Sequence, residues 1–379
     1  MKNKRNQFRE ERPFFTGFAV IAPVICFVLC LAALIVMCTV EERIRNTEPT
    51  RAAVDTASQI KLPVFEEEVA LCSDVIIRLL DGEMTMEEAS HSDTPYRPFV
   101  FEYQIGKNPG VFELSETMDF ARSEFYELDP FKTVLRIDNL KTGTRYYYRV
   151  TVEGDRYSGT FQTSSTPRFV SIPGAVNTRD IGGGVTLDGL TVRQGLLIRG
   201  TEIDGLVNEK RVLPAEQAED VREEFGFVYD FDLRQHTLAD ETYRSPLGVD
   251  HQFYTAPEYE AVFDDYWRDG IHRIFTDLAD PEKYPMYLHC TWGKDRTGTF
   301  VFLLQGILNM SEEDMLREYQ LSAFTNPETL EDNFIQVLID GLQVYEGETI
   351  QEKIRTFLIT DIGVTEAEIE SIRNIFLIQ

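Results

Sequence analysis

The stretch YLHCTWGKDRTGTF, residues 287–300, places a cysteine where a strand pattern changes into a helix pattern. The apolar run before Cys290 predicts a buried strand, and the residues after Arg296 have the apolar spacing of a helix. The five residues between Cys290 and Arg296 form a loop long enough for its backbone N–H groups to face one tetrahedral anion. The amino end of the following helix adds a partial positive charge, which favours phosphate. The stretch therefore predicts a phosphate-binding loop between a strand and a helix.

The residue types in this loop suit attack by sulfur on phosphorus. The field of the helix end and the loop N–H groups stabilises a thiolate, the nucleophilic form of cysteine. Arg296 carries a planar guanidinium that holds two phosphoryl oxygens at once, and Gly293 allows a turn that a side chain would obstruct. An inert buried cysteine at a strand end would leave a whole set of neighbours unexplained: His289, Gly293, Arg296, Thr297 and Gly298. We therefore interpret Cys290 as a nucleophile.

The loop resembles that of the cysteine-dependent tyrosine phosphatases. More narrowly, it is similar to the atypical bacterial tyrosine and lipid phosphatase family, whose loop reads His-Cys-x-x-Gly-Lys-Asp-Arg-Thr-Gly. The resemblance extends from about Pro167 to Gln379. Its other matching segments are NTRDIGG (177–183), GLLIR (195–199), DLR (232–234) and REYQLS (317–322). This resemblance implies a cysteine phosphatase fold, in which a central sheet is flanked by helices.

The resemblance also implies the catalytic roles. Cys290 would be the nucleophile and form a phosphocysteine intermediate, and Arg296 would bind the phosphoryl group and stabilise its transition-state charge. Asp295, inside the loop, would protonate the leaving oxygen. In the wider superfamily the acid is an Asp on a separate loop that carries Trp-Pro-Asp. The segment WRDG (267–270) lacks the proline and lies in a helical pattern, so we interpret Asp269 as a solvated helix residue.

The remaining candidate site residues form two groups. The predicted substrate-binding residues are Lys294, Gly293, Thr291, Trp292, Thr297 and Gly298. The predicted supporting residues are His289, Asp180, Arg179, Asp232, Arg234 and Arg199.

Some of these residues have a more specific expected role. We expect Thr297 to hydrogen-bond the sulfur, and Lys294 to place a second cation at the pocket mouth, which this family associates with phosphoinositide acceptance. We expect His289 to orient the loop or to be purely structural. Asp180 and Asp232 are expected to orient Arg296 or the loop, unless they are structural carboxylates.

The pattern from residue 167 to 379 predicts an α/β layer fold. FGFVYDFDLR and PMYLHC read as buried strands that end at polar residues. Residues 215–225, 259–278, 297–308 and 311–321 have helical apolar spacing, and Ser311 is a predicted N-cap. Strands that alternate with helices are typical of this fold class.

A different pattern precedes this region. Residues 61–166 contain short runs rich in β-branched and aromatic residues, separated by Gly, Asn, Asp and Pro, which predict a β-sandwich. Leu140, Thr144 and Tyr146 in LKTGTRYYYRV are placed as in a tyrosine corner. The segment therefore resembles a fibronectin type III-like domain, with a generic β-sandwich as the alternative.

The N-terminus predicts a membrane anchor. Residues 1–12 contain five basic residues, and no charged residue occurs from Pro13 to Val40. That run is long enough to cross a bilayer. We expect a cytoplasmic tail at 1–13, a transmembrane signal anchor at 14–40, a linker at 41–60 and an extracytoplasmic remainder. A cleaved signal peptide is the alternative.

Composition and residue spacing exclude several further classes of function. The net charge of −27 argues against nucleic-acid binding. The five cysteines form no disulfide pattern, and the five histidines show no metal-ligand spacing, so we expect neither metal nor cofactor. The sequence predicts a membrane-anchored phosphatase of phosphotyrosine proteins or phosphoinositides. Its alternatives are an inositol phosphate phosphatase and an inactive surface binding protein.

Overall fold

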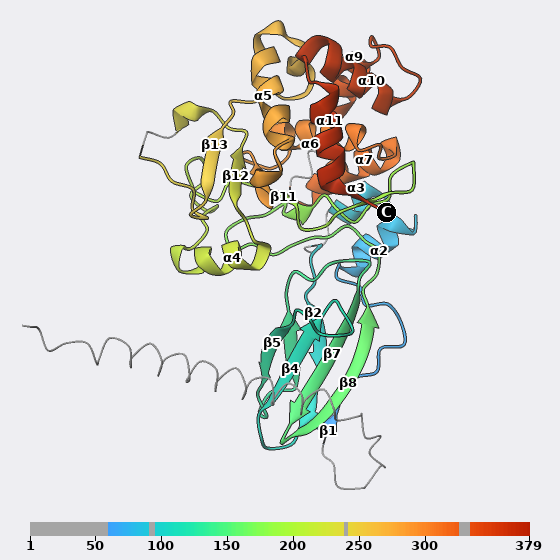
Figure 1. The fold of residues 1–379 in the computed structure, drawn as a ribbon, viewed down its shortest axis with the longest axis vertical. Coiled ribbons are helices and arrows are strands. Elements are labelled where there is room, and N and C mark those ends of the chain that lie inside the picture. Colours follow the sequence, from blue (N-terminus) through green and yellow to red (C-terminus); the bar gives the residue numbers. More distant parts are fainter. Residues whose placement is uncertain (1–59, 91–94, 239–241, 326–333) are drawn as a thin grey trace, which may run out of the picture. The chain divides into compact units, whose positions relative to one another are not determined.

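A computed structural model of the chain describes residues 60–90, 95–238, 242–325 and 334–379 (Figure 1). Within these ranges no helix is both long and apolar enough to span a bilayer. The predicted tail, the predicted anchor at 14–40 and nearly all of the predicted linker lie outside the described residues.

The strands between residues 99 and 162 belong to antiparallel sheets that share one apolar core. A four-stranded sheet has the order β5 (Glu124–Leu128), β4 (Gly110–Ser115), β7 (Arg145–Val152) and β8 (Asp155–Gln162). A second sheet pairs β2 (Phe99–Glu102) with β6 (Val134–Ile137), and a short pair joins β1 (Ile60–Lys61) to β3 (Gln104–Ile105). Burial alternates along β7, which is typical of a strand with one face on a core. Phe99 and Phe112 are fully buried in the core between the sheets.

The turn before β7 contains the predicted tyrosine hydrogen bond. The Tyr146 hydroxyl accepts from the backbone N–H of Lys141 at 2.9 Å. This bond closes the chain back on itself at the start of the strand, as in a tyrosine corner. The assignment of the segment as fibronectin type III-like stays a prediction.

The second core lies around a five-stranded mixed sheet. Its order is β13 (Asp250–Phe253), β12 (Tyr229–Asp232), β14 (Met286–His289), β11 (Leu197–Gly200) and β9 (Arg179–Asp180). All neighbours are parallel except β9, which is antiparallel to β11. His289 is in register with both Asp232 and Gly200. The carboxyl ends of three parallel strands therefore meet at one edge, which is where open α/β sheets bind ligands.

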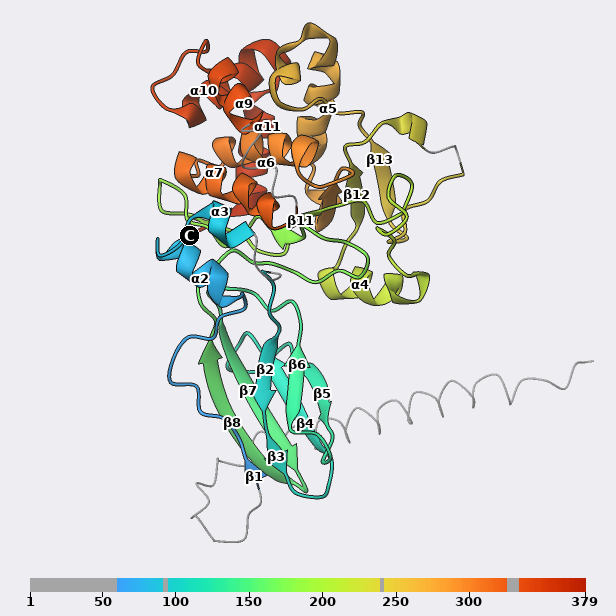
Figure 2. The same cartoon turned by 180° about the vertical axis from the view of Figure 1, so that it is seen from behind.

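Helices cover both faces of this sheet, as Figures 1 and 2 show. On one face Ile198 and Tyr287 pack with residues of α4 (Ala218–Phe225). On the other face Leu197 and Leu288 belong to the large core that includes the remaining helices of this region. These are α5 (Arg268–Leu278), α6 (Asp295–Ile307), α7 (Glu312–Gln320), α9 (Phe334–Leu342), α10 (Ile350–Phe357) and α11 (Glu366–Phe376). Because both faces are covered, β11, β12 and β14 are buried along their whole length.

The helices follow the predicted positions with one clear difference. Ser311 caps α7, and its side chain accepts from the N–H of Asp314, as predicted. The predicted helix over 259–278 is instead divided into a 3-10 turn at Tyr259–Phe263, another at Asp265–Trp267, and α5. Asp264 has an extended backbone and accepts from the N–H of Tyr266, so it starts a new turn and ends the first. The described region also contains the short helices α2 (Asp74–Leu80) and α3 (Met86–Ser90), a strand pair of β10 (Thr191–Val192) and β15 (Leu377–Ile378), and several further single turns of helix.

Candidate active site

The cysteine loop lies between β14 and α6. Cys290 is the first residue after β14 and is buried, and α6 begins at Asp295. Gly293 has φ +64°, and a Cβ on it would lie 2.3 Å from the carbonyl oxygen of Gly200. Only glycine fits this conformation and this close approach. The loop is therefore held directly against the carboxyl end of β11.

Two side chains hold the loop through the Gly293 carbonyl oxygen. The Asn177 amide donates to it at 3.0 Å and to the Trp292 carbonyl at 3.2 Å. The Arg199 guanidinium also donates to the Gly293 carbonyl. The NTRDIGG and GLLIR segments thus contribute a side chain each to one backbone oxygen of the loop.

Glu318, on α7, orients the two arginines of this support. Its carboxylate oxygens lie 2.7 Å from Nε of Arg179 and 2.6 Å from Nη1 of Arg199. Arg179 donates in turn to the Asn177 side chain at 2.5 Å. Burial, together with the nearby Arg199 charge, lowers the pKa of Arg179 to about 9 even though Glu318 opposes the shift. Glu318 is therefore the anion that allows two arginines to be buried together.

His289, one residue before the cysteine, is fixed from the neighbouring strand. Its Nε2 lies 2.8 Å from Oδ1 of Asp230 and 3.7 Å from Oδ2 of Asp232. Burial opposes its protonation, but the charges of Asp232 and Asp230 outweigh burial and raise the pKa of His289 to about 9. The imidazole is therefore a protonated, buried partner of these carboxylates at neutral pH.

Arg234 fills the centre of a buried carboxylate cluster. Its guanidinium bonds Glu202 and Asp204 at 2.5 Å and Asp232 at 2.6 Å. These carboxylates raise the pKa of Arg234 against the opposing effect of burial. Asp232 is thus bound to Arg234 and lies near His289, with no bond to Arg296 among the described side chains.

Asp180 serves a different part of the chain from the one expected. It pairs with Arg168 at 2.8 Å and accepts from the backbone N–H groups of Gly182 and Gly195. Arg168 also donates to the carbonyl of Leu140 at 3.2 Å. In the described region Asp180 therefore stabilises the chain around β9, and its ion pair and hydrogen bonds reach neither the loop nor Arg296.

The first turn of α6 carries the charged side of the site. Arg296 is partly exposed, and its Nε lies 3.5 Å from Oε2 of Glu258. Asp295 accepts from the Tyr259 hydroxyl at 2.6 Å. Lys294 is buried rather than at the pocket mouth, with its ammonium 3.7 Å from Asp295. The site therefore combines a buried cysteine with a partly exposed guanidinium in the first turn of the following helix.

The comparison with known families agrees with this geometry. A model of the tyrosine phosphatase family matches residues 170–378, which is more than half of the chain. The chain belongs to the tyrosine phosphatase family. None of the curated proteins compared with this phosphatase matches it.

Other loop residues of this phosphatase have distinct surroundings. The Thr297 hydroxyl is buried and has no hydrogen-bond partner among the described residues. Gly298 packs against the Tyr319 ring, which a Cβ would approach to 2.7 Å. Thr291 is buried and Trp292 is exposed at the tip of the loop. Of these four residues, only Trp292 is open to a large substrate.

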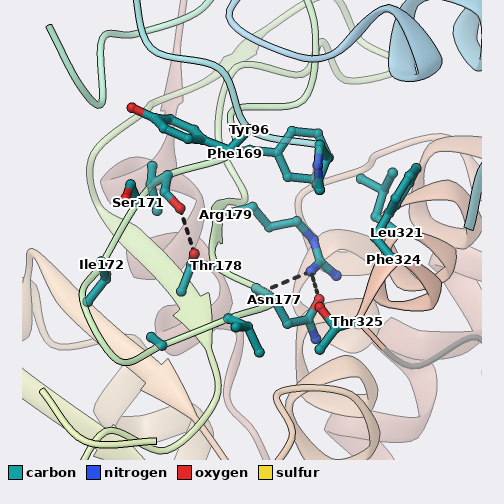
Figure 3. Close-up of a pocket in the computed structure, with 14 residues that line it drawn as sticks. Tyr96, Phe169, Ser171, Ile172, Asn177, Thr178, Arg179, Leu321, Phe324 and Thr325 are labelled. Atoms are coloured by element: carbon teal, nitrogen blue, oxygen red, sulfur yellow. Dashed lines mark hydrogen bonds between the residues drawn. The ribbon is translucent and has the colours of Figure 1, made fainter. Parts of the chain in front are cut away.

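A cavity of about 350 Å³ lies behind the supports of the loop (Figure 3). Asn177 and Arg179 line it side by side, joined by a hydrogen bond, and Phe169 and Phe324 add apolar walls. Neither Cys290 nor Arg296 lines it. The cavity therefore adjoins two side chains of the loop's support but does not include the cysteine.

Several residues near the site were not among those predicted from the sequence: Asn177, Asp230, Glu258, Tyr259 and Glu318. Glu318 lies within the matching REYQLS segment. That match indicated that the segment belongs to the family pattern, but it did not indicate that Glu318 pairs with Arg179 and Arg199. The segment APEY (256–259) lacks a Trp-Pro-Asp motif, so no pattern in the sequence indicated Glu258. Asp269, in contrast, is exposed on α5 as expected. The described residues contain no group of three or more His, Cys, Asp or Glu side chains suited to hold a metal.

Proposed function

We infer that this phosphatase hydrolyses phosphate monoesters of tyrosine in proteins, and of phosphoinositides, through a phosphocysteine intermediate. The observation that carries this proposal is the arrangement of Cys290 and Arg296. The cysteine directly follows β14, four residues separate it from α6, and the arginine occupies the first turn of that helix. Helix ends of this kind bind phosphate, and they favour the nucleophilic thiolate.

Each step follows from the position of a named group. The Cys290 sulfur attacks phosphorus, the P–O bond to the leaving group breaks, and a thiophosphate ester forms. Arg296 binds the phosphoryl oxygens by its fork and stabilises their charge. The Thr297 hydroxyl, buried beside the cysteine loop, suits donation to the sulfur as it departs in the second step. Water then releases inorganic phosphate.

The test offers the purified full chain four substrates side by side without added metal. These are a phosphotyrosine peptide, a phosphoserine peptide, phosphoinositide vesicles and inositol hexakisphosphate. We expect turnover of the first and third, inhibition by vanadate, and no loss of activity with a chelator. Cys290→Ser should abolish turnover but still bind vanadate. Activity that requires a divalent metal, or that survives in Cys290→Ser, would overturn the mechanism.

The alternatives have their own outcomes in the same assay. Preferential turnover of inositol hexakisphosphate would indicate an inositol phosphate phosphatase. The buried position of Lys294 does not favour that function, because a highly charged substrate needs more accessible cations. No turnover of any substrate would favour an inactive surface binding protein.

The uncharged run at 13–40 supports membrane anchoring with the catalytic residues outside the cytoplasm. A protease added to intact cells should digest the chain beyond residue 40. Complete protection in cells with demonstrably sealed membranes would reverse the orientation.

A further inference from the structure

The loop that follows β13 places a carboxylate beside the arginine of the cysteine loop. Oε2 of Glu258 lies 3.5 Å from Nε of Arg296, and 48% of the Glu258 side chain is exposed to solvent. Pro257 and Tyr259, on either side of it, are buried. Glu258 therefore contacts both the arginine and the solvent.

The backbone around Glu258 is held on both sides. Before it, the N–H groups of residues 254–256 donate to carbonyl groups of residues 232–234, which joins this loop to the end of β12. After it, the N–H of Tyr259 donates to the Thr299 hydroxyl at 3.0 Å, and the Tyr259 hydroxyl donates to Asp295 at 2.6 Å. Both acceptors belong to α6. The Glu258 carboxylate can therefore leave Arg296 by rotation of its own side chain while its backbone stays in place.

The carboxyl group of Glu258 carries a negative charge at neutral pH. Partial burial and the nearby charge of Asp295 raise the pKa of Glu258, whereas the charge of Arg296 lowers it. The usual pKa of a glutamate is about 4.3, well below neutral pH. A carboxyl group that is paired with a guanidinium and about half exposed to water keeps its charge at that pH. Glu258 is therefore an anion at the edge of a site that binds an anion.

Both cations of the cysteine loop have a carboxylate partner. Arg296 lies beside Glu258, and the ammonium of Lys294 lies 3.7 Å from Oδ1 of Asp295. The Lys294 side chain is also buried. A phosphoryl group that binds Arg296 therefore lies close to Glu258. Any further negative charge on the substrate approaches this carboxylate rather than an exposed ammonium.

We propose that Glu258 selects the substrates of this phosphatase by charge: it favours a single phosphate with neutral or basic surroundings and disfavours a second phosphate or acidic residues beside the phosphotyrosine. The inference rests on the proposed function and narrows its substrate class. The reacting phosphoryl group displaces the Glu258 carboxylate from Arg296. The displaced carboxylate stays beside the bound phosphate, where it repels further negative charge and attracts positive charge. Glu258 makes and breaks no covalent bond, and Asp295 keeps the proton-donor role expected for it.

The experiment compares two phosphotyrosine peptides that differ only in the residues flanking the phosphotyrosine, which are lysines in one and glutamates in the other. For wild type at low ionic strength we expect kcat/KM to be about tenfold higher for the lysine peptide. Glu258→Gln should lower this ratio by about three- to fivefold, and Glu258→Lys should lower it further. Because the ratio compares two substrates of one variant, any change in the orientation of Arg296 affects both terms equally. Glu223→Gln removes one exposed charge from α4, on the other face of the sheet, and should keep the wild-type ratio.

Ionic strength and lipid substrates provide further readouts. The wild-type ratio should fall as salt rises from about 0.1 M, where the Debye length is about 10 Å, to about 1 M, where it is about 3 Å. The ratio of Glu258→Gln should change less over the same range. Wild type should also prefer a soluble short-chain phosphoinositide with one phosphate over one with three, and Glu258→Gln should narrow that difference. Vanadate affinity and thermal unfolding, measured in parallel, establish that each variant is folded.

The outcomes separate charge selection by Glu258 from the proposed function. If wild type is inactive, or Cys290→Ser is active, the proposed function fails. If wild type depends on Cys290 but Glu258→Gln keeps the wild-type ratio, only charge selection fails, even where that variant is slower with both peptides. An equal drop of the ratio in Glu223→Gln would assign the preference to the net charge of the chain and would also overturn the role of Glu258.

Discussion

A Cβ atom on Gly293 would lie 2.3 Å from the carbonyl oxygen of Gly200, so the cysteine loop and the end of β11 touch backbone to backbone. The same Gly293 residue presents its own carbonyl oxygen to Asn177 and Arg199. The loop is therefore positioned through its backbone.

Gly293→Ala should disrupt this contact. The substitution adds both strain at φ +64° and a clash with backbone, so we expect a loss of about 1–3 kcal/mol in the free energy of unfolding and a severe loss of activity. Urea denaturation and phosphatase assays measure the two effects. Gly189→Ala is the matched control, since Gly189 has φ +81° but open space around it. Equal activity losses in the two variants would contradict a specific role for the Gly200 contact.

Glu318→Gln should destabilise the arginine pair beneath the loop. Removing the anion leaves Arg179 and Arg199 buried without their shared partner, which typically costs about 3–5 kcal/mol. The measurement is the free energy of unfolding by denaturant. Glu313→Gln, which breaks an exposed pair with Arg317 on the same helix, should change it by less than about 1 kcal/mol. Similar losses in the free energy of unfolding for the two substitutions would show that Glu318 is not needed to stabilise the buried arginines.

The buried His289 should make stability depend on pH. Its pKa is raised to about 9 in the folded chain, compared with about 6.5 when unfolded, so its protonated form is stabilised by folding. Protonated His289 therefore adds on the order of 3 kcal/mol to the free energy of unfolding. This stabilisation is fully present below pH about 6.5 and is lost as pH rises through about 9. Denaturation of wild type and His289→Gln across this range should show the difference between them shrinking as pH rises. His272→Gln, on the partly exposed side of α5, serves as the control. A constant difference between wild type and His289→Gln would mean that His289 is neutral in the fold.

Tyr146→Phe tests the hydrogen bond that closes the turn before β7. Loss of the hydroxyl leaves the Lys141 N–H without this acceptor and should lower the free energy of unfolding by about 1 kcal/mol. Tyr147→Phe, at a half-buried position on the opposite face of the strand, should have a smaller effect. Phosphatase activity should be unchanged in both variants. A larger loss in the free energy of unfolding for Tyr147→Phe than for Tyr146→Phe would show that the bond from Lys141 to Tyr146 does not stabilise the turn.

Local sequence was sufficient to identify the cysteine loop, because its parts are contiguous. A strand, a loop and a helix that follow one another must place Cys290 at the helix end whatever the rest of the fold does. The tyrosine corner and the Ser311 cap were predictable for the same reason, since both bonds join residues close in sequence. The expected helix over 259–278 was wrong in its first half, where the backbone turns at Asp264 allow Glu258 and Tyr259 to reach α6.

By itself, the sequence determined that a cysteine, a glycine turn and an arginine share one short loop at the start of a helix, and that alternating strands and helices surround it. Only the tertiary structure decided which distant side chains support that loop. The sheet order β13-β12-β14-β11-β9 differs from chain order, so it brings Asn177 and Arg199 to one carbonyl oxygen and directs Asp180 elsewhere. Glu318, on α7, then pairs with Arg199. The same order places Glu258 beside Arg296. Partners of this kind depend on how strands pair and helices pack, and no local pattern of residues encodes that pairing.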